Sequence, residues 1–346
     1  ENMLFFDPQP LEKTDYLFLE STYGNRNHKD DENSLDELAN AIERSYKLGG
    51  KVIIPTFAVE RAQEIIYSLY LIHRRGQLPK NMPIYLDSPL AIKATEVFER
   101  YKDDLDFHEI KNDMPSIADF DFKVNYTLGT EESQALNAME GPAIILSASG
   151  MCNAGRIKHH LKHNIWRPET SIVFVGFQAV GTLGRKIVEG ATSVSLMNND
   201  LNVSAKIYTI NGFSAHAGQN QLLDWVSTIA KCKPHIILIH GEKSAQEELG
   251  RLIKEKYALD VTIPAYLDEI ELTAKASDDE QVALSLAKHA IPKLDWQFVF
   301  DDLDLRFKQL HNKLDHVQER SWEDQTEIHD KVAKLNNDLY KLIAQL

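Results

Sequence analysis

Three side chains able to bind a metal or move a proton stand at or near the ends of apolar runs in this sequence. "YLFLE" ends on Glu20, "HIILIH" ends on His240, and His216 closes "KIYTINGFSAH" a few residues after an expected strand. Neutral imidazole is a common zinc ligand and a general acid or base, while a carboxylate orients imidazoles or binds metal. Each residue alone is explained more simply by a bond to the backbone. Because all three lie at or near the ends of expected strands, together they indicate a functional site.

A loop of small residues, "SASGMCNAGRIKHHLKH" at 147–163, has the features of an anion cradle. Glycine and serine let the backbone approach a ligand closely, and an expected helix then presents unpaired N–H groups. Arg156 adds positive charge. The alternative is a Gly-rich turn before a solvated helix. The histidines of this segment do not all face one point, and we interpret them as surface residues: 159, 160 and 163.

A second glycine-spaced loop, "GFQAVGTLGRK" at 176–186, lacks the Gly-Lys-Ser/Thr ending of an ATP-binding P-loop. It could still offer Thr182 and backbone amides to an anion. "PTFAVERAQE" at 55–64 places Arg61 early on an expected helix, where the alternative role is a surface salt bridge.

Alternating apolar runs and helix-like segments must position these residues. The β-branched runs suit strands covered on both faces, and they occupy 16–21, 51–57, 83–88, 143–150, 171–177 and 235–241. Helix-like segments follow at 35–48, 58–75, 90–101, 155–163 and 219–229. This alternation predicts an α/β protein with mostly parallel sheets, whose sites form beyond the carboxyl ends of the strands. Residues 193–210 instead suggest a hairpin around an Asn-Asn-Asp turn.

The C-terminal part changes character after about residue 270. Apolar residues recur with four-three spacing from Leu303 to Val317 and again from Ile328 to Leu346, which is a heptad pattern. Ser321 and Asp324 fit a helix N-terminal cap and favour a helical hairpin, while one long helix with a stutter is the alternative. An apolar seam of this kind needs a partner, either the domain itself or a second copy in a homo-oligomer.

Composition excludes several classes of protein. The 52 acidic and 38 basic residues leave a net charge of −14, so a nucleic-acid role requires local cationic patches or metal ions. Two cysteines cannot form a disulfide framework, and this favours a reducing, cytoplasmic compartment. No apolar run is long enough to span a membrane, and the first residues do not resemble a signal peptide.

Six segments in order resemble the β-CASP branch of the metallo-β-lactamase-fold RNA-processing nucleases: "LESTYGNRNH", "IPTFAVERAQE", "SASGMCNAGR", "GFQAVGTLGR", "GFSAH" and "IHGE". The resemblance covers about residues 1–265. It implies part of an αββα nuclease domain at 1–23 and 212–265. The inserted β-CASP domain, with a parallel sheet, would be 24–211, and 266–346 would be a helical tail without a counterpart in the family.

The resemblance also implies roles for individual residues. Glu20 matches the acidic residue that hydrogen-bonds the motif-B histidine, here His216, which assists the leaving oxygen. His240 matches a zinc ligand that is histidine in RNA-processing members and usually valine in DNA-repair members. The two loops would line the RNA path with Arg61 nearby, so the expected RNA- or phosphate-binding residues are Ser149, Gly150, Met151, Arg156, Thr182, Arg185 and Arg61.

The sequence departs from the family pattern in two places. Glu60 stands where the family usually has glycine. More importantly, the metal motif His-x-His-x-Asp-His is absent, and none of the 13 histidines forms a His-x-His pair. One imidazole cannot hold the two zinc ions of such a site. We therefore expect the C-terminal part of a zinc nuclease, with the N-terminal segment either removed or supplied as a separate chain.

The resulting prediction is zinc-dependent phosphodiester hydrolysis of RNA by the intact protein. A catalytically silent relative that binds RNA or protein is the main alternative. DNA ranks below RNA as the substrate, and a small-molecule hydrolase of the same fold ranks lower, because it would lack the large insertion.

Overall fold

The computed structural model describes residues 8–27, 33–102 and 115–273, together with isolated positions between 307 and 335. The chain divides into two compact units, Glu1–Pro264 and Ala265–Leu346. The first unit contains two parallel sheets and a short hairpin, and the sequence-based expectation of an α/β protein is confirmed.

The larger sheet has six parallel strands in the order β4-β3-β5-β2-β6-β9. Its strands are β2 (Lys51–Pro55), β3 (Ile84–Leu86), β4 (Val124–Tyr126), β5 (Ala143–Ser147), β6 (Ser171–Phe174) and β9 (Lys206–Thr209). Every residue of β2, β5 and β6 is buried. This is why these strands are continuous apolar runs without polar alternation.

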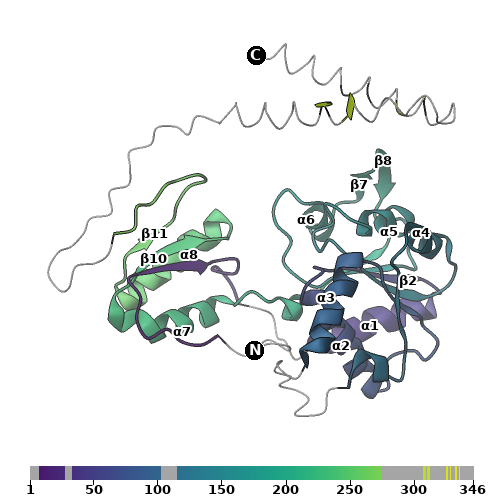
Figure 1. Cartoon of the computed structure of the whole chain (residues 1–346), viewed down its shortest axis with the longest axis horizontal. Helices are drawn as coiled ribbons and strands as arrows, with labels where there is room; N and C mark the ends of the chain where they lie inside the picture. The colour runs from purple at the N-terminus through teal and green to yellow at the C-terminus, as the bar shows by residue number, and fades with distance from the viewer. Residues whose placement is uncertain are drawn as a thin grey trace. The chain divides into compact units, whose positions relative to one another are not determined.

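Helices cover both faces of this sheet (Figure 1). Val52 and Ile54 pack into one core with α1 (Ser34–Lys47), α2 (Arg61–Arg74) and α3 (Pro89–Arg100). Ile53 points to the opposite face and packs with α4 (Thr130–Ala138), α5 (Ile157–Asn164) and α6 (Leu183–Val188). The alternation of side chains along β2 thus divides one apolar run between two cores.

The smaller sheet joins segments from opposite ends of the first unit. β1 (Tyr16–Glu20) pairs with β10 (His235–Ile239), which pairs with β11 (Val261–Thr262), and both pairs are parallel. Leu17, Leu19, Ile236 and Leu238 pack against α7 (Gln219–Ile229) and α8 (Lys243–Tyr257) on one face. On the other face Phe18 and Ile239 keep 49% and 38% of their surface exposed. The remaining short helices are η3 (Ile117–Asp119), η4 (Asn211–Phe213) and η5 (Ala230–Cys232).

The six strands and five helices expected from the sequence are all present, with ends shifted by a few residues. Two strands and three α-helices of the described residues were missed: β4, β11, α4, α6 and α8. β4 has a single buried residue, Val124, and so produces no apolar run. The segment 193–210 forms the expected hairpin, β7 (Ser193–Leu196) and β8 (Asn199–Asn202), but it then continues into β9 of the large sheet. The turn falls on Met197 and Asn198, both with positive φ, which suits a tight hairpin.

In the second unit, the described positions of the heptad pattern are helical: Phe307, Leu310, Ile328, Val332 and Leu335. Ser321 and Asp324 lie outside the described residues, so the choice between a hairpin and one long helix stays a prediction. Oligomer formation through this seam also stays a prediction. Within the described part of the chain, no helix combines the length and apolar character needed to cross a membrane.

Candidate active site

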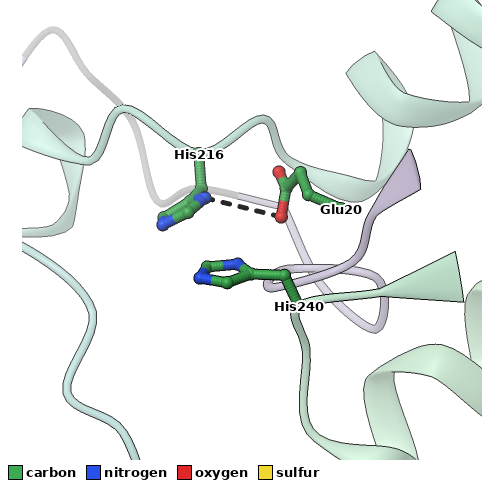
Figure 2. Close-up of side chains that lie close together, drawn as sticks. All are labelled: Glu20, His216 and His240. Carbon is green, nitrogen blue, oxygen red and sulfur yellow. Dashed lines mark ion pairs between the residues drawn. The ribbon is translucent and has the colours of Figure 1, made fainter. Parts of the chain in front are cut away.

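The fold brings Glu20, His216 and His240 together from three separate segments (Figure 2). Each offers one ligand atom, and these atoms all lie within 4.8 Å of one another. Nδ1 of His216 is 3.4 Å from Oε2 of Glu20. The rings of His216 and His240 are stacked, with centroids 5.2 Å apart and an angle of 28° between their planes. A carboxylate and two imidazoles therefore share one partly solvent-exposed site.

The parallel pairing of β1 with β10 positions two of these residues. Glu20 is in register with Ile239, so His240 begins the turn beside the end of β1. His240 has a φ of 49°, a left-handed conformation that histidine adopts more readily than most residues. In this conformation its carbonyl accepts hydrogen bonds from the backbone N–H of Ser21 at 3.3 Å and from the Thr22 hydroxyl at 3.1 Å.

Gly241 is needed for this turn because the two strand ends approach so closely. A Cβ at position 241 would lie 2.6 Å from both the carbonyl oxygen and Oγ of Ser21. The Ser21 hydroxyl also donates to the carbonyl of Ile239 at 2.8 Å. The glycine after His240 therefore allows the imidazole to stand directly beside the β1 terminus.

Thr22 is a site residue that the sequence reasoning missed. Its side chain is buried, and its Oγ1 lies 3.2 Å from Nδ1 of His240 and 3.4 Å from Nδ1 of His216. Its backbone N–H donates to Oε2 of Glu20 at 2.8 Å. Thr22 thus contacts all three members of the site. Its place two residues after Glu20 in "LESTYG" was the only signal available in the sequence.

The site keeps Glu20 ionised. Burial by itself raises the pKa of Glu20, but the hydrogen bonds from His216 and Thr22 outweigh it, and the net effect lowers the pKa below its usual value. An ionised carboxylate can only accept hydrogen bonds. It therefore selects the form of His216 that carries a proton on Nδ1.

The two glycine-containing loops expected to hold an anion lie against each other. The N–H of Gly184 donates to the carbonyl of Met151 at 3.1 Å, and the N–H of Leu183 donates to Oδ1 of Asn153 at 3.1 Å. The Gln178 amide donates to the carbonyl of Gly150 at 3.1 Å. These bonds join the loop after β5 to the loop after β6 at the carboxyl edge of the large sheet.

Three residues of these loops make contacts within the protein: Ser149, Gly150 and Thr182. A Cβ at Gly150 would lie 3.0 Å from the ring of Phe57, so a larger residue would crowd this contact. Ser149 donates from Oγ to the carbonyl of Ala154 at 3.2 Å. Thr182 caps α6, because its Oγ1 accepts from the N–H of Arg185 at 3.1 Å.

Arg156 is engaged inside the protein. Its guanidinium donates to Oδ1 of Asp87 at 2.7 Å, to the carbonyl of Thr127 at 2.9 Å and to the carbonyl of Leu128 at 2.8 Å. These contacts tie the start of α5 to the ends of β3 and β4. A structural role accounts for this arginine without an anion.

Arg61 and Arg185 also have protein partners. Arg61 is buried and paired with Glu64, and burial lowers its pKa to about 10. Arg185 contacts Glu189 at 2.5 Å, Glu242 at 3.1 Å and the carbonyl of Gln178 at 3.1 Å. Because Glu242 lies two residues beyond His240, this ion pair connects α6 to the strand end of the site.

The interpretation of all three clustered histidines as surface residues is wrong for His160. His159 and His163 are exposed, whereas His160 is fully buried. Its Nε2 lies 2.6 Å from Oδ2 of Asp87, and its Nδ1 lies 2.9 Å from Oδ1 of Asn137. The reason is helical geometry: positions 157, 160, 161 and 164 form the inner face of α5.

The donor set at the site fits zinc in kind. Two imidazoles and a carboxylate are typical zinc ligands, and they come close enough to face one ion. Structural zinc takes four ligands, and a catalytic site takes three from protein plus a water. Because Glu20 is already paired with His216, His240 is the member of this group best placed to serve as a ligand.

Comparison with known proteins places this geometry in a recognised class. Residues 62–187 match the Beta-Casp domain, and residues 200–264 match the Zn-dependent metallo-hydrolase RNA specificity domain. These two matches define a protein of the β-CASP class.

Related full-length proteins support the same assignment. The chain is 39% identical to Ribonuclease TTHA0252 of Thermus thermophilus over 71% of this chain and 56% of that protein. It is 35% identical to Transcription termination factor FttA of Methanothermobacter thermautotrophicus over 74% of this chain and 41% of that protein. It is 34% identical to the FttA of Thermococcus kodakarensis over 74% of this chain and 40% of that protein. The chain thus spans about half the length of these relatives or less. It belongs to the β-CASP family of metallo-β-lactamase-fold proteins.

Proposed function

We propose that this chain contributes to zinc-dependent hydrolysis of phosphodiester bonds in RNA. The observation that carries the proposal is the cluster of Glu20, His216 and His240 at the meeting point of β1 and β10. The match to an RNA specificity domain and the likeness to a ribonuclease support RNA as the substrate. Zinc would supply an activated water and polarise the phosphoryl oxygens.

Three residues of the chain would bind zinc, donate the proton and orient the donor. His240 serves as a zinc ligand. His216, whose Nδ1 faces the Glu20 carboxylate at 3.4 Å, holds a proton at Nε2 for the departing oxygen. Glu20 orients this imidazole and stays ionised, since its own pKa is lowered despite burial.

The RNA backbone would follow the two joined loops toward this cluster. Ser149, Gly150 and Met151 lie on one loop, Thr182 ends the other, and Arg185 lies in the first turn of α6, which follows it. The Arg185–Glu242 ion pair supports this path, because it links α6 to the segment carrying His240. We assign Arg156 and Arg61 a supporting role, because Arg156 pairs with Asp87 and Arg61 pairs with Glu64 within α2.

We assign the small sheet with α7 and α8 to the αββα nuclease domain, formed from 1–23 and 212–265, and residues 24–211 to the inserted β-CASP domain. Three donors cannot complete a dinuclear zinc centre. Further imidazoles and carboxylates would come from another polypeptide segment. The exposed side chains of Phe18 and Ile239 on the open face of the small sheet offer it an apolar contact surface.

The test combines zinc binding with RNA cleavage. In the enzyme assembled with its remaining ligands, His216→Ala should lower cleavage of a labelled RNA by at least about 100-fold while zinc content stays unchanged. His163→Ala, at an exposed histidine on α5, is the matched control and should retain full activity. Normal turnover by His216→Ala would refute the assigned role.

The same assay separates the main alternative. A catalytically silent relative would bind the RNA yet leave it uncleaved even when zinc occupancy is complete. His240→Ala should lose zinc, and retention of the full zinc content would overturn its assignment as a ligand.

A further inference from the structure

We propose that Thr22 is a positioning residue that holds His240 in the tautomer with its proton on Nδ1, so that the lone pair of Nε2 remains available to a metal. The metal-binding consequence rests on the proposed function. The tautomer itself is a property of this chain and can be measured without metal or RNA.

Thr22 occupies the centre of the site. Its side chain is 4% exposed, so water does not compete freely for its hydroxyl. Its Oγ1 lies 3.2 Å from Nδ1 of His240 and 3.4 Å from Nδ1 of His216. The same hydroxyl donates to the backbone carbonyl of His240 at 3.1 Å.

The number of available protons determines which of these groups donates and which accepts each hydrogen bond. A threonine hydroxyl has one proton to donate and two lone pairs that accept. The carbonyl oxygen of His240 has no proton and can only accept, so the Thr22 hydroxyl donates its proton to this oxygen. The hydroxyl therefore presents lone pairs to the imidazole nitrogens that face it. Nδ1 of His240 must then be a donor, which leaves Nε2 unprotonated in the neutral ring.

The opposite tautomer would cost hydrogen bonds. If Nδ1 of His240 carried no proton, the Thr22 hydroxyl would have to donate to it. It would then give up its bond to the His240 carbonyl. This contact lies at the turn that places His240 beside β1. The local backbone and the ring tautomer are therefore coupled through one side chain.

The direction of the ring fits this role. Figure 2 shows the second nitrogen of His240 pointing away from Glu20, on the same side as the second nitrogen of His216. A histidine that binds metal through one nitrogen usually donates from its other nitrogen to a fixed acceptor, which sets its tautomer and orientation. Thr22 provides that acceptor here, where a carboxylate or carbonyl oxygen is more common.

The first test measures the tautomer directly in the metal-free full chain. Long-range ¹H–¹⁵N spectra of histidine-labelled protein are recorded at a pH where imidazole is neutral, and the His240 signals are assigned by their loss in His240→Gln. Wild type and Thr22→Ser should show Nδ1–H, because serine keeps the hydroxyl. Thr22→Val keeps the shape but removes the hydroxyl, and should shift His240 toward Nε2–H. Thr228→Val, at an exposed threonine of α7, should leave the spectrum unchanged.

The second test measures Zn²⁺ affinity of the same proteins. Thr22→Val should weaken binding about 10- to 100-fold, the range seen when such outer partners of a ligand are removed, and Thr22→Ser should restore it. A backbone amide spectrum unchanged away from the site shows that Thr22→Val has folded. Retention of Nδ1–H by Thr22→Val would overturn the proposal, and so would unchanged Zn²⁺ affinity. If the assembled enzyme cleaves no RNA while the tautomer behaves as expected, only the proposed function fails.

Discussion

Replacing Asp87 by alanine should destabilise the large sheet strongly, because this buried carboxylate is the centre of a charged network. Its two oxygens accept from Arg156 at 2.7 Å, Thr127 at 2.5 Å, Ser133 at 2.6 Å and His160 at 2.6 Å. Asp87 and His160 are fully buried. Removing one partner of a buried ion pair leaves the others uncompensated and typically costs about 3–5 kcal/mol.

The lowered pKa of this carboxylate leads independently to a similar magnitude. Burial by itself raises the pKa of Asp87, but the hydrogen bonds from His160 and Ser133, the largest of several, outweigh it and lower the pKa from 3.8 to about 2. At about 1.4 kcal/mol per pH unit, the ionised form contributes about 2–3 kcal/mol to folding. Because the folded-state pKa is lowered, this contribution is present above pH 3.8 and is lost as the pH falls toward 2.

Amide hydrogen exchange of peptides from β2 and β5 reports the free energy of opening this sheet and suits the experiment. At neutral pH, Asp87→Ala should lower that free energy by about 3–5 kcal/mol. The matched control is Asp36→Ala, which removes an exposed carboxylate 3.6 Å from Arg75 and should cost about 1 kcal/mol or less. Equal losses in the two variants would refute the reasoning. In urea unfolding, the difference between wild type and Asp87→Ala should shrink between pH 4 and pH 2.

Two further predictions follow from close packing. Gly241→Ala should lower the free energy of unfolding by about 1–3 kcal/mol and weaken Zn²⁺ binding, because the new Cβ would lie 2.6 Å from Ser21. Gly176→Ala is the control and should be tolerated, since a Cβ there has open space. Equal denaturation midpoints for the two variants would contradict this prediction. Cys232 should react with a thiol reagent in the folded chain, whereas Cys152 should react only after unfolding. The reason is that Cys152 is fully buried and burial raises its pKa to about 12. Rapid reaction of two thiols per native chain would contradict this prediction.

The strands that carry the site could be predicted from the sequence because their signal is local. Apolar runs such as 16–21 and 235–241 identify β1 and β10, and the polar residue at the end of each run marks the carboxyl edge. The same local logic missed β4, and it assigned the strand containing β9 to a hairpin instead of the large sheet. Neither contains a continuous apolar run, and their pairing with β3 and β6 determines their conformation.

Arg156 and His160 show that a local sequence motif does not reveal the partners of a side chain. Arg156 lies in a Gly-rich loop that resembles an anion cradle, yet its donors reach Asp87 and two backbone carbonyls. His160 lies in a run of polar residues, yet the inner face of α5 buries it completely. In both cases the partner is Asp87, a residue about 70 positions earlier whose importance has no local pattern.

The chemistry available at the site was therefore readable from residue types and strand ends, since a carboxylate and two imidazoles after strands already indicate proton transfer or metal binding. Their arrangement was decided only by tertiary structure. The parallel register of Glu20 with Ile239 places His240 next to Thr22, and one buried hydroxyl then meets both imidazoles. Local sequence specifies backbone conformation over a few residues, whereas hydrogen-bond direction depends on which distant groups a side chain meets after folding.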